Sequence, residues 1–228
     1  MQTLMNQIFI IFFLPSFAMG AATEAFYISP MEFNLAPDAK ITAKLTIVNK
    51  NDVETKIHVE AFGRSDDLDG SEQRKPTTDL VVDAKDFSLA KGASKIIHIA
   101  YRGPSKILRE RAYRIVVRQA DAVAEASLDL RFVYVASVYV APLKASPILS
   151  VETVRRNGGA EMEILIHNNG TAHAGPAAVA AFLEKAAATG IVKSNLSKDS
   201  LKNILRQNFL AGSSRRVQVQ TGTSGSSH

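Results

Sequence analysis

The sequence contains no cysteine, so no disulfide can staple the fold and burial of a core has to stabilise it alone. The same absence excludes a cysteine nucleophile and thiolate metal sites. Hydrophobic residues make up 46% of the 228 positions, which is enough to build a core, and the length fits two modest domains better than one. We therefore expect a globular chain.

Charge is missing from the first 23 residues, which contain no Lys, Arg, Asp or Glu. The run IFIIFFL in this region is too short to be a membrane-spanning helix, and the small residues Ala18, Gly20, Ala21 and Ala22 follow it. The pattern predicts a cleavable signal peptide over residues 1–22, with an N-terminal membrane anchor as the alternative. No other stretch approaches spanning length, so we expect an exported protein that is not integral to a membrane.

Motifs for catalysis or cofactor binding are also missing. The sequence has no HExxH, GxSxG, GxxxxGK or GxGxxG, and its five histidines show no metal-ligand spacing. The formal charge of +5 is mild, and the Lys and Arg residues are scattered, which argues against nucleic-acid binding. We expect no enzymatic activity, no cofactor, no metal and no nucleic-acid partner.

Alternating apolar and polar residues predict short strands through the first half of the chain. The strictest alternation covers residues 41–47 and ends at Asn49, and residues 57–61 predict a strand that pairs with it through a hairpin. The slip at Pro30 predicts a bulged edge strand, and residues 63–78 are predicted to be a polar loop. Further strands are predicted over 80–82, 87–89 and 95–101. This regular spacing without a helical period indicates an antiparallel, immunoglobulin-like sandwich.

The stretch from Arg109 to Pro142 predicts two strands, 112–118 and 127–140. The second, with fourteen residues, is longer than a sandwich strand needs, and it carries alternating large apolar residues. These are Leu128, Leu130, Phe132 and Tyr134. A strand with spare edge and spare apolar side chains can be lent to another protein. The alternative is that these side chains face their own core.

A second, smaller domain is predicted after the sequence PLKASP. Strands are expected over 148–154, 161–167 and 177–183, with a last strand at Val217 and Val219. Residues 197–210 fit a short amphipathic helix or a loop followed by a strand. The predicted organisation is all-β: an N-terminal immunoglobulin-like domain (23–142), a linker (143–147), a C-terminal β-sandwich (148–220) and a flexible tail (221–228).

In order along the chain, the segments KITAKLTIVNKN, FSLAKGASKIIHIAYRGP, ERAYRIVVRQ, LDLRFVYVASVYVAP and IHNNGTAHA resemble the PapD-like periplasmic pilus chaperones. The resemblance covers most of residues 24–220 and is strongest to the alternative or archaic branch, including the common-pilus type. It implies two immunoglobulin-like domains arranged as a boomerang. It also implies a periplasmic protein that captures pilin subunits, caps them by donor-strand complementation and delivers them to an outer-membrane usher.

The resemblance further implies roles for particular residues. The donor positions fall on Leu128, Leu130, Phe132 and Tyr134. Conventional family members anchor the pilin C-terminal carboxylate with an Arg and a Lys, but Phe33 and Ser137 stand at those places in this sequence. Another basic residue has to replace them. Arg114 is the first choice, and the weaker candidates are Arg102, Arg118 and Arg131.

Two other functions remain open at this stage. One is an exported pilin-like structural or adhesive subunit, which would polymerise or aggregate when purified alone. The other is a secreted β-sandwich binding module, since a fold does not fix a function. A chaperone would instead be a soluble monomer or a self-capped homodimer.

Overall fold

The computed structural model describes residues 26–120, 131–157, 161–188, 202, 204, 205 and 208–220. The predicted signal peptide, the C-terminal tail and most of residues 197–210 lie outside these ranges. Within them, no helix is both long enough and apolar enough to cross a membrane.

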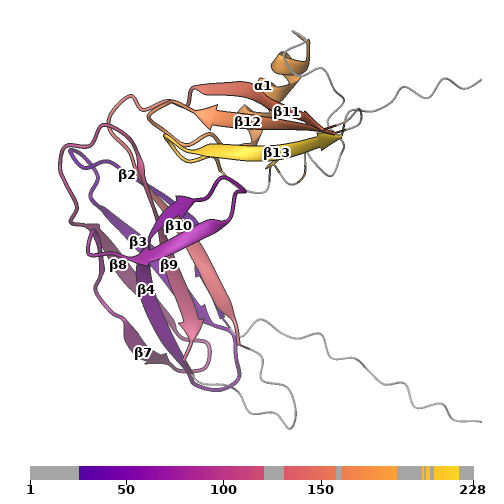
Figure 1. Ribbon diagram of the computed structural model, residues 1–228. Coiled ribbons are helices and arrows are strands. Elements are labelled where there is room, and N and C mark those ends of the chain that lie inside the picture. The colour runs from indigo at the N-terminus through magenta and orange to yellow at the C-terminus, as the bar shows by residue number, and fades with distance from the viewer. Residues whose placement is uncertain are drawn as a thin grey trace, which may run out of the picture.

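The first domain is a sandwich of two sheets (Figure 1). One sheet has the order β1 (Phe26–Ser29), β3 (Thr42–Asn49), β8 (Ser94–Tyr101) and β6 (Leu80–Val82). The other has the order β2 (Glu32–Leu35), β10 (Val133–Val140), β9 (Arg111–Gln119), β4 (Thr55–Asp66) and β5 (Glu72–Pro76), and β7 (Asp86–Leu89) pairs with β4. Strand β2 runs parallel to β10, and the other pairs are antiparallel.

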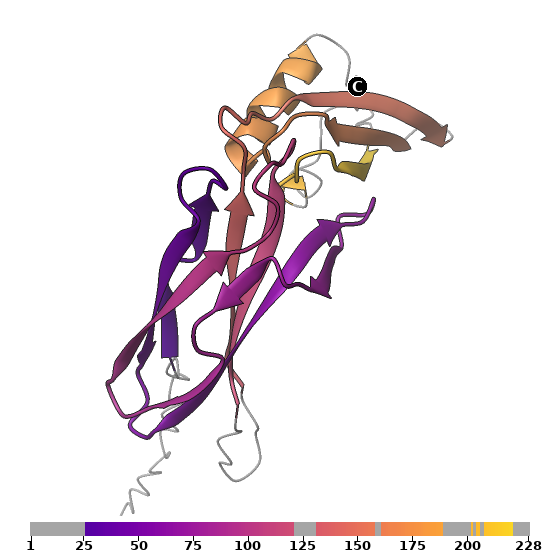
Figure 2. The same ribbon diagram turned by 90° about the vertical axis from the view of Figure 1, so that its left-hand side faces the viewer.

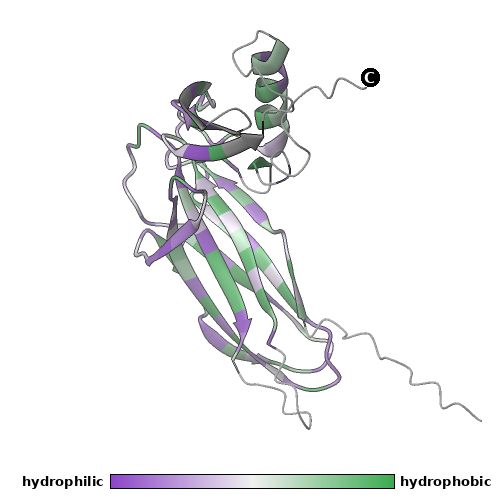
Figure 3. Cartoon of the chain, turned by 45° about the vertical axis from the view of Figure 1, so that its right-hand side comes forward, coloured by the Kyte–Doolittle hydropathy of each residue, from purple (hydrophilic) through white to green (hydrophobic). Residues whose placement is uncertain are grey.

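Alternating side chains from both sheets form the core, and Figure 3 shows the matching alternation of apolar and polar positions along the strands. Leu45 and Ile47 of β3, Ile97 and Ile99 of β8, and Ile115 of β9 are completely buried. Each such side chain contributes about 1.5–3 kcal/mol to folding. The core therefore stabilises the domain without a disulfide.

Two predicted pairings in this domain are wrong. Strands β3 and β4 do not form a hairpin, because β3 pairs with β1 and β8 while β4 lies in the opposite sheet. The predicted bulged edge strand is two strands, β1 and β2, which belong to different sheets on either side of Pro30. Alternation fixes which residues face the core, but both sheets of a sandwich offer the same kind of face.

The predicted polar loop over 63–78 is also wrong. Strand β4 continues to Asp66, and β5 pairs with it to form a hairpin. The Asp69-Gly70 pair lies at the turn, where Gly70 has φ of 86° and its N–H donates to the carbonyl of Asp67 at 2.9 Å. The segment is predicted to be a loop because it is rich in charged residues, but these residues form a two-stranded ribbon and their side chains pair with one another.

The long strand predicted over 127–140 begins later than expected. Strand β10 starts at Val133, after Arg131 and Phe132, and residues 127–130 lie outside the described residues. Its partner β9 ends at Gln119, whose N–H donates to the Phe132 carbonyl at 3.2 Å, so the ladder has no further rung within the described residues.

The second domain has a three-stranded sheet in the order β11 (Leu149–Asn157), β12 (Glu161–Asn168) and β13 (Ser214–Gln220). Helix α1 (Pro176–Ala188) covers one face of the sheet, where Val179 and Leu183 pack with Ile164 and Ile166. The strand predicted over 177–183 is therefore wrong. Four alanines in PAAVAAFLEKAAA precede the last turn and three more end the helix, and a proline stands at the first helical position; both features favour a helix.

Each domain buries one asparagine at the end of a strand. The Asn49 side-chain amide donates to the carbonyls of Val53, Leu89 and Ala90 at 2.8–3.1 Å, and its carbonyl accepts the N–H of Asn51 at 2.9 Å. Asn168 holds the loops around β12 in the same way. Because both asparagines have no exposed surface, their amide groups are satisfied by these bonds, which in turn hold the turn carbonyls.

The two domains are set at an angle, as Figures 1 and 2 show. The chain is predominantly β, and the predicted class of two immunoglobulin-like domains in a boomerang arrangement is confirmed. The β4–β5 hairpin of the first domain reaches the second, where the Arg216 N–H donates to the Leu68 carbonyl at 2.6 Å.

Candidate functional site

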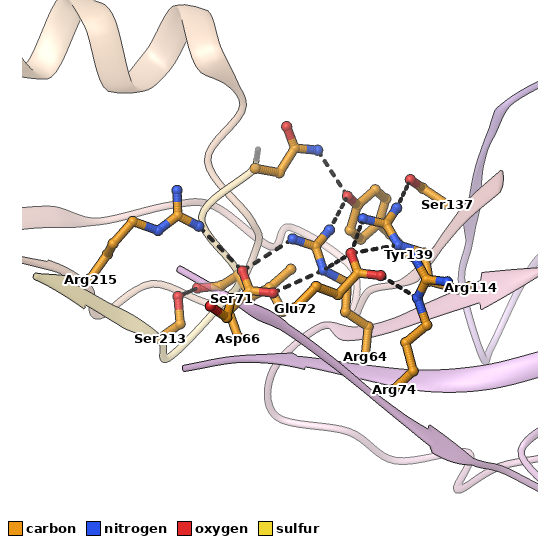
Figure 4. Close-up of polar contacts among 12 residues, drawn as sticks. Arg64, Asp66, Ser71, Glu72, Arg74, Arg114, Ser137, Tyr139, Ser213 and Arg215 are labelled. Carbon is orange, nitrogen blue, oxygen red and sulfur yellow. Dashed lines mark hydrogen bonds and ion pairs between the residues drawn. The ribbon is translucent and has the colours of Figure 1, made fainter. Parts of the chain in front are cut away.

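The β4–β5 hairpin gathers four charged side chains on one face. Arg64 lies opposite Arg74, and Asp66 lies opposite Glu72. Residues two apart on a strand share a face, so each arginine has a carboxylate beside it on its own strand. Arg114 of β9 and Arg215 of β13 complete the group (Figure 4), which we call the arginine–carboxylate cluster: Arg64, Asp66, Glu72, Arg74, Arg114 and Arg215.

Asp66 is the buried half of this cluster. Its carboxylate accepts two hydrogen bonds from the Arg64 guanidinium, at 3.0 and 3.1 Å, and lies 3.3 Å from Nη2 of Arg215. Arg215 packs over the Phe209 ring at 4.0 Å; burial lowers the pKa of Arg215, although Asp66 opposes the shift. Asp66 and Arg64 have 2% or less of their side chains exposed, and the buried contact of Asp66 with Arg215 is a structural link between the domains.

Glu72 is the more accessible half, with 14% of its side chain exposed. Three guanidinium groups surround its carboxylate: Arg74 Nε at 2.5 Å, Arg114 Nη2 at 2.5 Å and Nε at 2.9 Å, and Arg64 Nε at 3.1 Å. Burial raises the pKa of Glu72, but the hydrogen bonds from Arg114 and Arg74 outweigh it and hold the pKa at about 2. Glu72 is therefore ionised at neutral pH.

The cluster carries an excess of positive charge. Its four arginines face two carboxylates, which leaves a net charge of two positive units among these six side chains. Guanidinium groups prefer carboxylate and phosphate partners that accept two hydrogen bonds at once. An excess of guanidinium groups of this kind favours an anionic partner such as a carboxylate.

Arg114, the first-choice anchor, lies in this cluster. Its Nη1 donates to the Ser137 hydroxyl, and only 13% of its side chain is exposed. Ser137 is one of the two places where the sequence resemblance implies a basic residue in conventional members; the other, Phe33, is 7% exposed and packs in the core. The Arg114 guanidinium thus reaches the position that Ser137 leaves without a charge.

The other anchor candidates lie elsewhere. Arg118 is exposed on β9 and pairs with Glu60 at 2.8 Å. Arg102 is exposed just after β8, where its N–H donates to the Asp79 carbonyl at 2.7 Å. Arg131 is exposed and precedes β10. None of these three is brought into the arginine–carboxylate cluster.

Strand β10 has an edge without a partner among the described residues. Strand β2 pairs with it only from Ser137 to Val140. The Ser137 N–H donates to the Met31 carbonyl on that side, while the Phe132 carbonyl accepts from β9, so odd-numbered backbone groups of β10 point away from β9. The N–H and C=O of Val133 and Val135 therefore face what we call the open edge, the side of residues 133–136 away from β9.

The predicted donor side chains divide into two pairs. Phe132 and Tyr134 are half-buried and pack against the core of their own domain, where the Tyr134 ring meets Phe26 edge-on at 5.0 Å. Leu128 and Leu130 lie outside the described residues. The even-numbered positions share the core-facing side of β10 with Ala136 and Val138, as the period of two requires.

The arginine–carboxylate cluster and the last residues of β10 lie close to the junction between the domains. Tyr139 of β10 accepts a hydrogen bond from Asn208 at 2.9 Å and stacks on His173, with the ring centroids 3.9 Å apart. His173 in turn lies 2.9 Å from the carboxylate of Glu110. A cavity of about 550 Å³ beside Arg64 and Asp66 is lined by residues of both domains. These contacts hold the second domain against the end of the first.

Sequence reasoning missed Arg64, Asp66, Glu72 and Arg74. The signal was present: R-x-D and E-x-R flank a turn that contains Asp-Gly, and such a spacing places opposite charges on one face of a hairpin. Among the described residues, no three His, Asp or Glu side chains group as a metal site.

No family model matches the chain, and no curated protein matches it. Solved structures do. A chain of the CsuC–CsuE chaperone–tip adhesion subunit complex from archaic Csu pili of Acinetobacter baumannii has a TM-score of 0.64 at 13% identity, covering 89% of this chain and 90% of that one. The Escherichia coli chaperone DraB has a TM-score of 0.54 at 16% identity, covering 86% of this chain and 85% of that one. A chain of the Salmonella enterica SafA pilin–SafB chaperone complex has a TM-score of 0.55 at 9% identity, covering 87% of this chain and 86% of that one. The chain thus has the fold of the PapD-like fimbrial chaperones.

Proposed function

We propose that this chain is a periplasmic chaperone that captures and caps pilin subunits by donor-strand complementation and delivers them to an outer-membrane usher. The proposal assigns it no catalytic activity. The observation that carries it is the open edge of β10 beside a cluster with excess positive charge. The solved structures with this fold include chaperones in complex with a pilin or a tip adhesion subunit, which supports pilin partners.

A pilin that lacks its last strand exposes unpaired backbone groups and an apolar groove. The open edge offers the N–H and C=O groups of Val133 and Val135 to the unpaired backbone groups of the pilin. Alternate side chains of the same donor strand fill the apolar groove of the pilin. Phe132 and Tyr134 already bury part of their surface in their own core. The proposal therefore assigns the larger share of groove filling to Leu128 and Leu130, at about 1.5–3 kcal/mol for each fully buried side chain.

The C-terminal carboxylate of the pilin is assigned to Arg114, with Arg64 and Arg74 as neighbouring donors. Arg114 reaches Ser137 on β10, so a carboxylate bound there lies next to the strand that the pilin pairs with. Ion pairs that are partly shielded from water and that accept several hydrogen bonds are stronger than exposed ones. The carboxylate thereby sets the register of the captured pilin.

Removal of one N–H from the open edge tests the donor strand. In Val135→Pro the lost N–H faces away from β9, so pairing between β9 and β10 is kept. We expect the variant to remain folded by circular dichroism and to lose co-purification with a co-expressed pilin. Val135→Ala is the matched control, since it shortens the side chain and keeps the N–H. Normal pilin retention by Val135→Pro would refute donation through this edge.

Polar substitutions test the groove fillers. Leu130→Asp and Phe132→Asp would each place a charge in an apolar groove, and we expect pilin capture to be lost. Phe132→Asp also disturbs the core of its own domain, so Leu130→Asp is the more decisive variant. Retention of pilin by a folded Leu130→Asp protein would show that Leu130 does not fill the groove.

Truncation of Arg114 tests the anchor. Arg114→Ala removes the guanidinium that lies nearest to Ser137, and we expect pilin binding to weaken by at least ten-fold. Arg118→Ala on the same strand is the control, because its partner Glu60 lies outside the cluster. Equal losses in the two variants would move the anchor away from Arg114.

The open edge also permits pairing with a second copy of the chain. We therefore propose that the protein without pilin is a monomer or a self-capped homodimer. Size-exclusion chromatography with light scattering distinguishes these states from the polymers that a pilin-like subunit would form.

A further inference from the structure

The strongest carboxylate-binding position in the cluster is already occupied by Glu72. Its two carboxylate oxygens lie within 3.1 Å of Nε of Arg64 and Arg74 and of Nε and Nη2 of Arg114. An incoming carboxylate that approaches Arg114 finds its best donors engaged. Two carboxylates cannot share one set of donors at about 3 Å without strong repulsion.

Glu72 comes from a short strand at the edge of its sheet. Strand β5 has five residues, pairs only with β4 among the described strands, and forms the end of the sheet. Its other four residues are exposed. A short edge strand with few buried contacts opens at low cost, so the Glu72 side chain can leave the cluster without unfolding the core.

Asp66, the other carboxylate, differs in each of these respects. It is 2% exposed, is held by two hydrogen bonds from Arg64 and contacts Arg215 in the second domain. Asp66 keeps Arg64 in place and joins the domains whether or not Glu72 is bound. The two acids therefore have different roles, and only Glu72 lies where an external group competes for the same donors.

We propose that Glu72 is an internal competitor that occupies the anchor in the free protein and is displaced by the C-terminal carboxylate of the pilin. This inference rests on the proposed function, since it concerns the carboxylate anchor of that site. Binding exchanges one carboxylate for another, and the displaced Glu72 becomes hydrated. Weak or poorly placed anions do not displace it, so the exchange favours a carboxylate that the neighbouring strand holds in register.

The test uses the full mature chain and a defined probe. The probe is an N-acetylated hexapeptide of alternating valine and serine, prepared with a free C-terminal carboxylate and with a C-terminal amide. Binding is followed by NMR through the Nε–Hε signals of Arg64, Arg74 and Arg114. In Glu72→Gln we expect the acid peptide to bind tighter than in the wild type by on the order of ten-fold, with no change for the amide peptide.

Two further variants complete the test. Glu60→Gln removes the negative charge from the ion pair between Glu60 and Arg118. It should leave the affinities for the acid peptide and for the amide peptide unchanged. Glu72→Asp keeps the charge but shortens the side chain, so it should bind the acid peptide with intermediate affinity, and it replaces Glu72→Gln if that variant unfolds.

Equal or weaker binding of the acid peptide by Glu72→Gln would overturn the proposal, because Glu72 would then position the arginines. If the wild type and Glu72→Gln both bind the acid and the amide peptide equally well, the assignment of a carboxylate anchor is wrong. The proposal that Glu72 competes for that anchor is then wrong as well. Pilin capture through the open edge is judged separately by Val135→Pro, so the two failures are distinguishable.

Discussion

Glu72→Gln is expected to lower the stability of the first domain at neutral pH and to lose this effect in acid. The three guanidinium groups around Glu72 hold its pKa at about 2, against an ordinary value of 4.5. That difference corresponds to about 3 kcal/mol as an upper limit. Because water reaches part of the site, screening reduces the expected loss to about 1–2 kcal/mol.

The sign follows from the lowered pKa. A carboxylate whose pKa is lowered by folding stabilises the protein above its unfolded pKa, and the contribution is lost as the pH falls through the folded pKa. The difference between wild type and Glu72→Gln should therefore be constant above about pH 5 and vanish near pH 2. The glutamine amide resembles the protonated carboxyl, so the proteins converge in acid.

Urea unfolding at a series of pH values, followed by tyrosine fluorescence and circular dichroism, measures this difference. Glu60→Gln is the control, since its partly exposed pair with Arg118 is expected to contribute less than about 1 kcal/mol. A difference that stays constant down to pH 3, or a variant more stable than the wild type at pH 7, would refute the account of the cluster.

Three other substitutions test contacts that support the site. Asn49→Ala leaves three turn carbonyls without a donor and should cost about 2–4 kcal/mol in urea unfolding; a loss below about 1 kcal/mol would contradict this. Gly170→Ala should destabilise the second domain by about 2 kcal/mol or more in thermal unfolding, since a Cβ there would lie 2.3 Å from the Ser146 carbonyl oxygen; an unchanged melting temperature would argue against this close approach. Tyr139→Ala removes the stack on His173 and should broaden interdomain distances measured by electron paramagnetic resonance, whereas Tyr139→Phe keeps the ring and should not.

The β4–β5 hairpin shows why the sequence did not predict the arginine–carboxylate cluster. Glu72 and Arg114 are 42 residues apart, and Arg215 lies 149 residues from Asp66. Each of these charges, taken alone, fits a solvated strand or loop. Only the pairing of β4 with β5 and β9, together with the contact of β13 with the hairpin, places them within hydrogen-bond distance.

Helix α1 illustrates a different limit. Its segment alternates too little for a half-buried strand and is rich in alanine, so local propensity favoured the helix that the structure contains. The strand prediction followed the β-rich context of the neighbouring segments. Local preference and packing against Ile164 and Ile166 agree here, which explains why the helix is well formed.

The sequence by itself determined which residues are buried. The period of two along β3, β8 and β9 marks one face of each strand as apolar, and that property is local to the chain. Likewise, the absence of cysteine settled that burial and not disulfides stabilises the domains.

Only the tertiary structure decided how the strands are arranged and which charges meet. Two apolar faces pack equally well from either sheet, so the alternation does not say that β3 and β4 belong to opposite sheets or that β10 is left with an open edge. The placement of Arg114 beside Ser137 depends on the register between β9 and β10. That register results from long-range packing, which no single stretch of sequence contains.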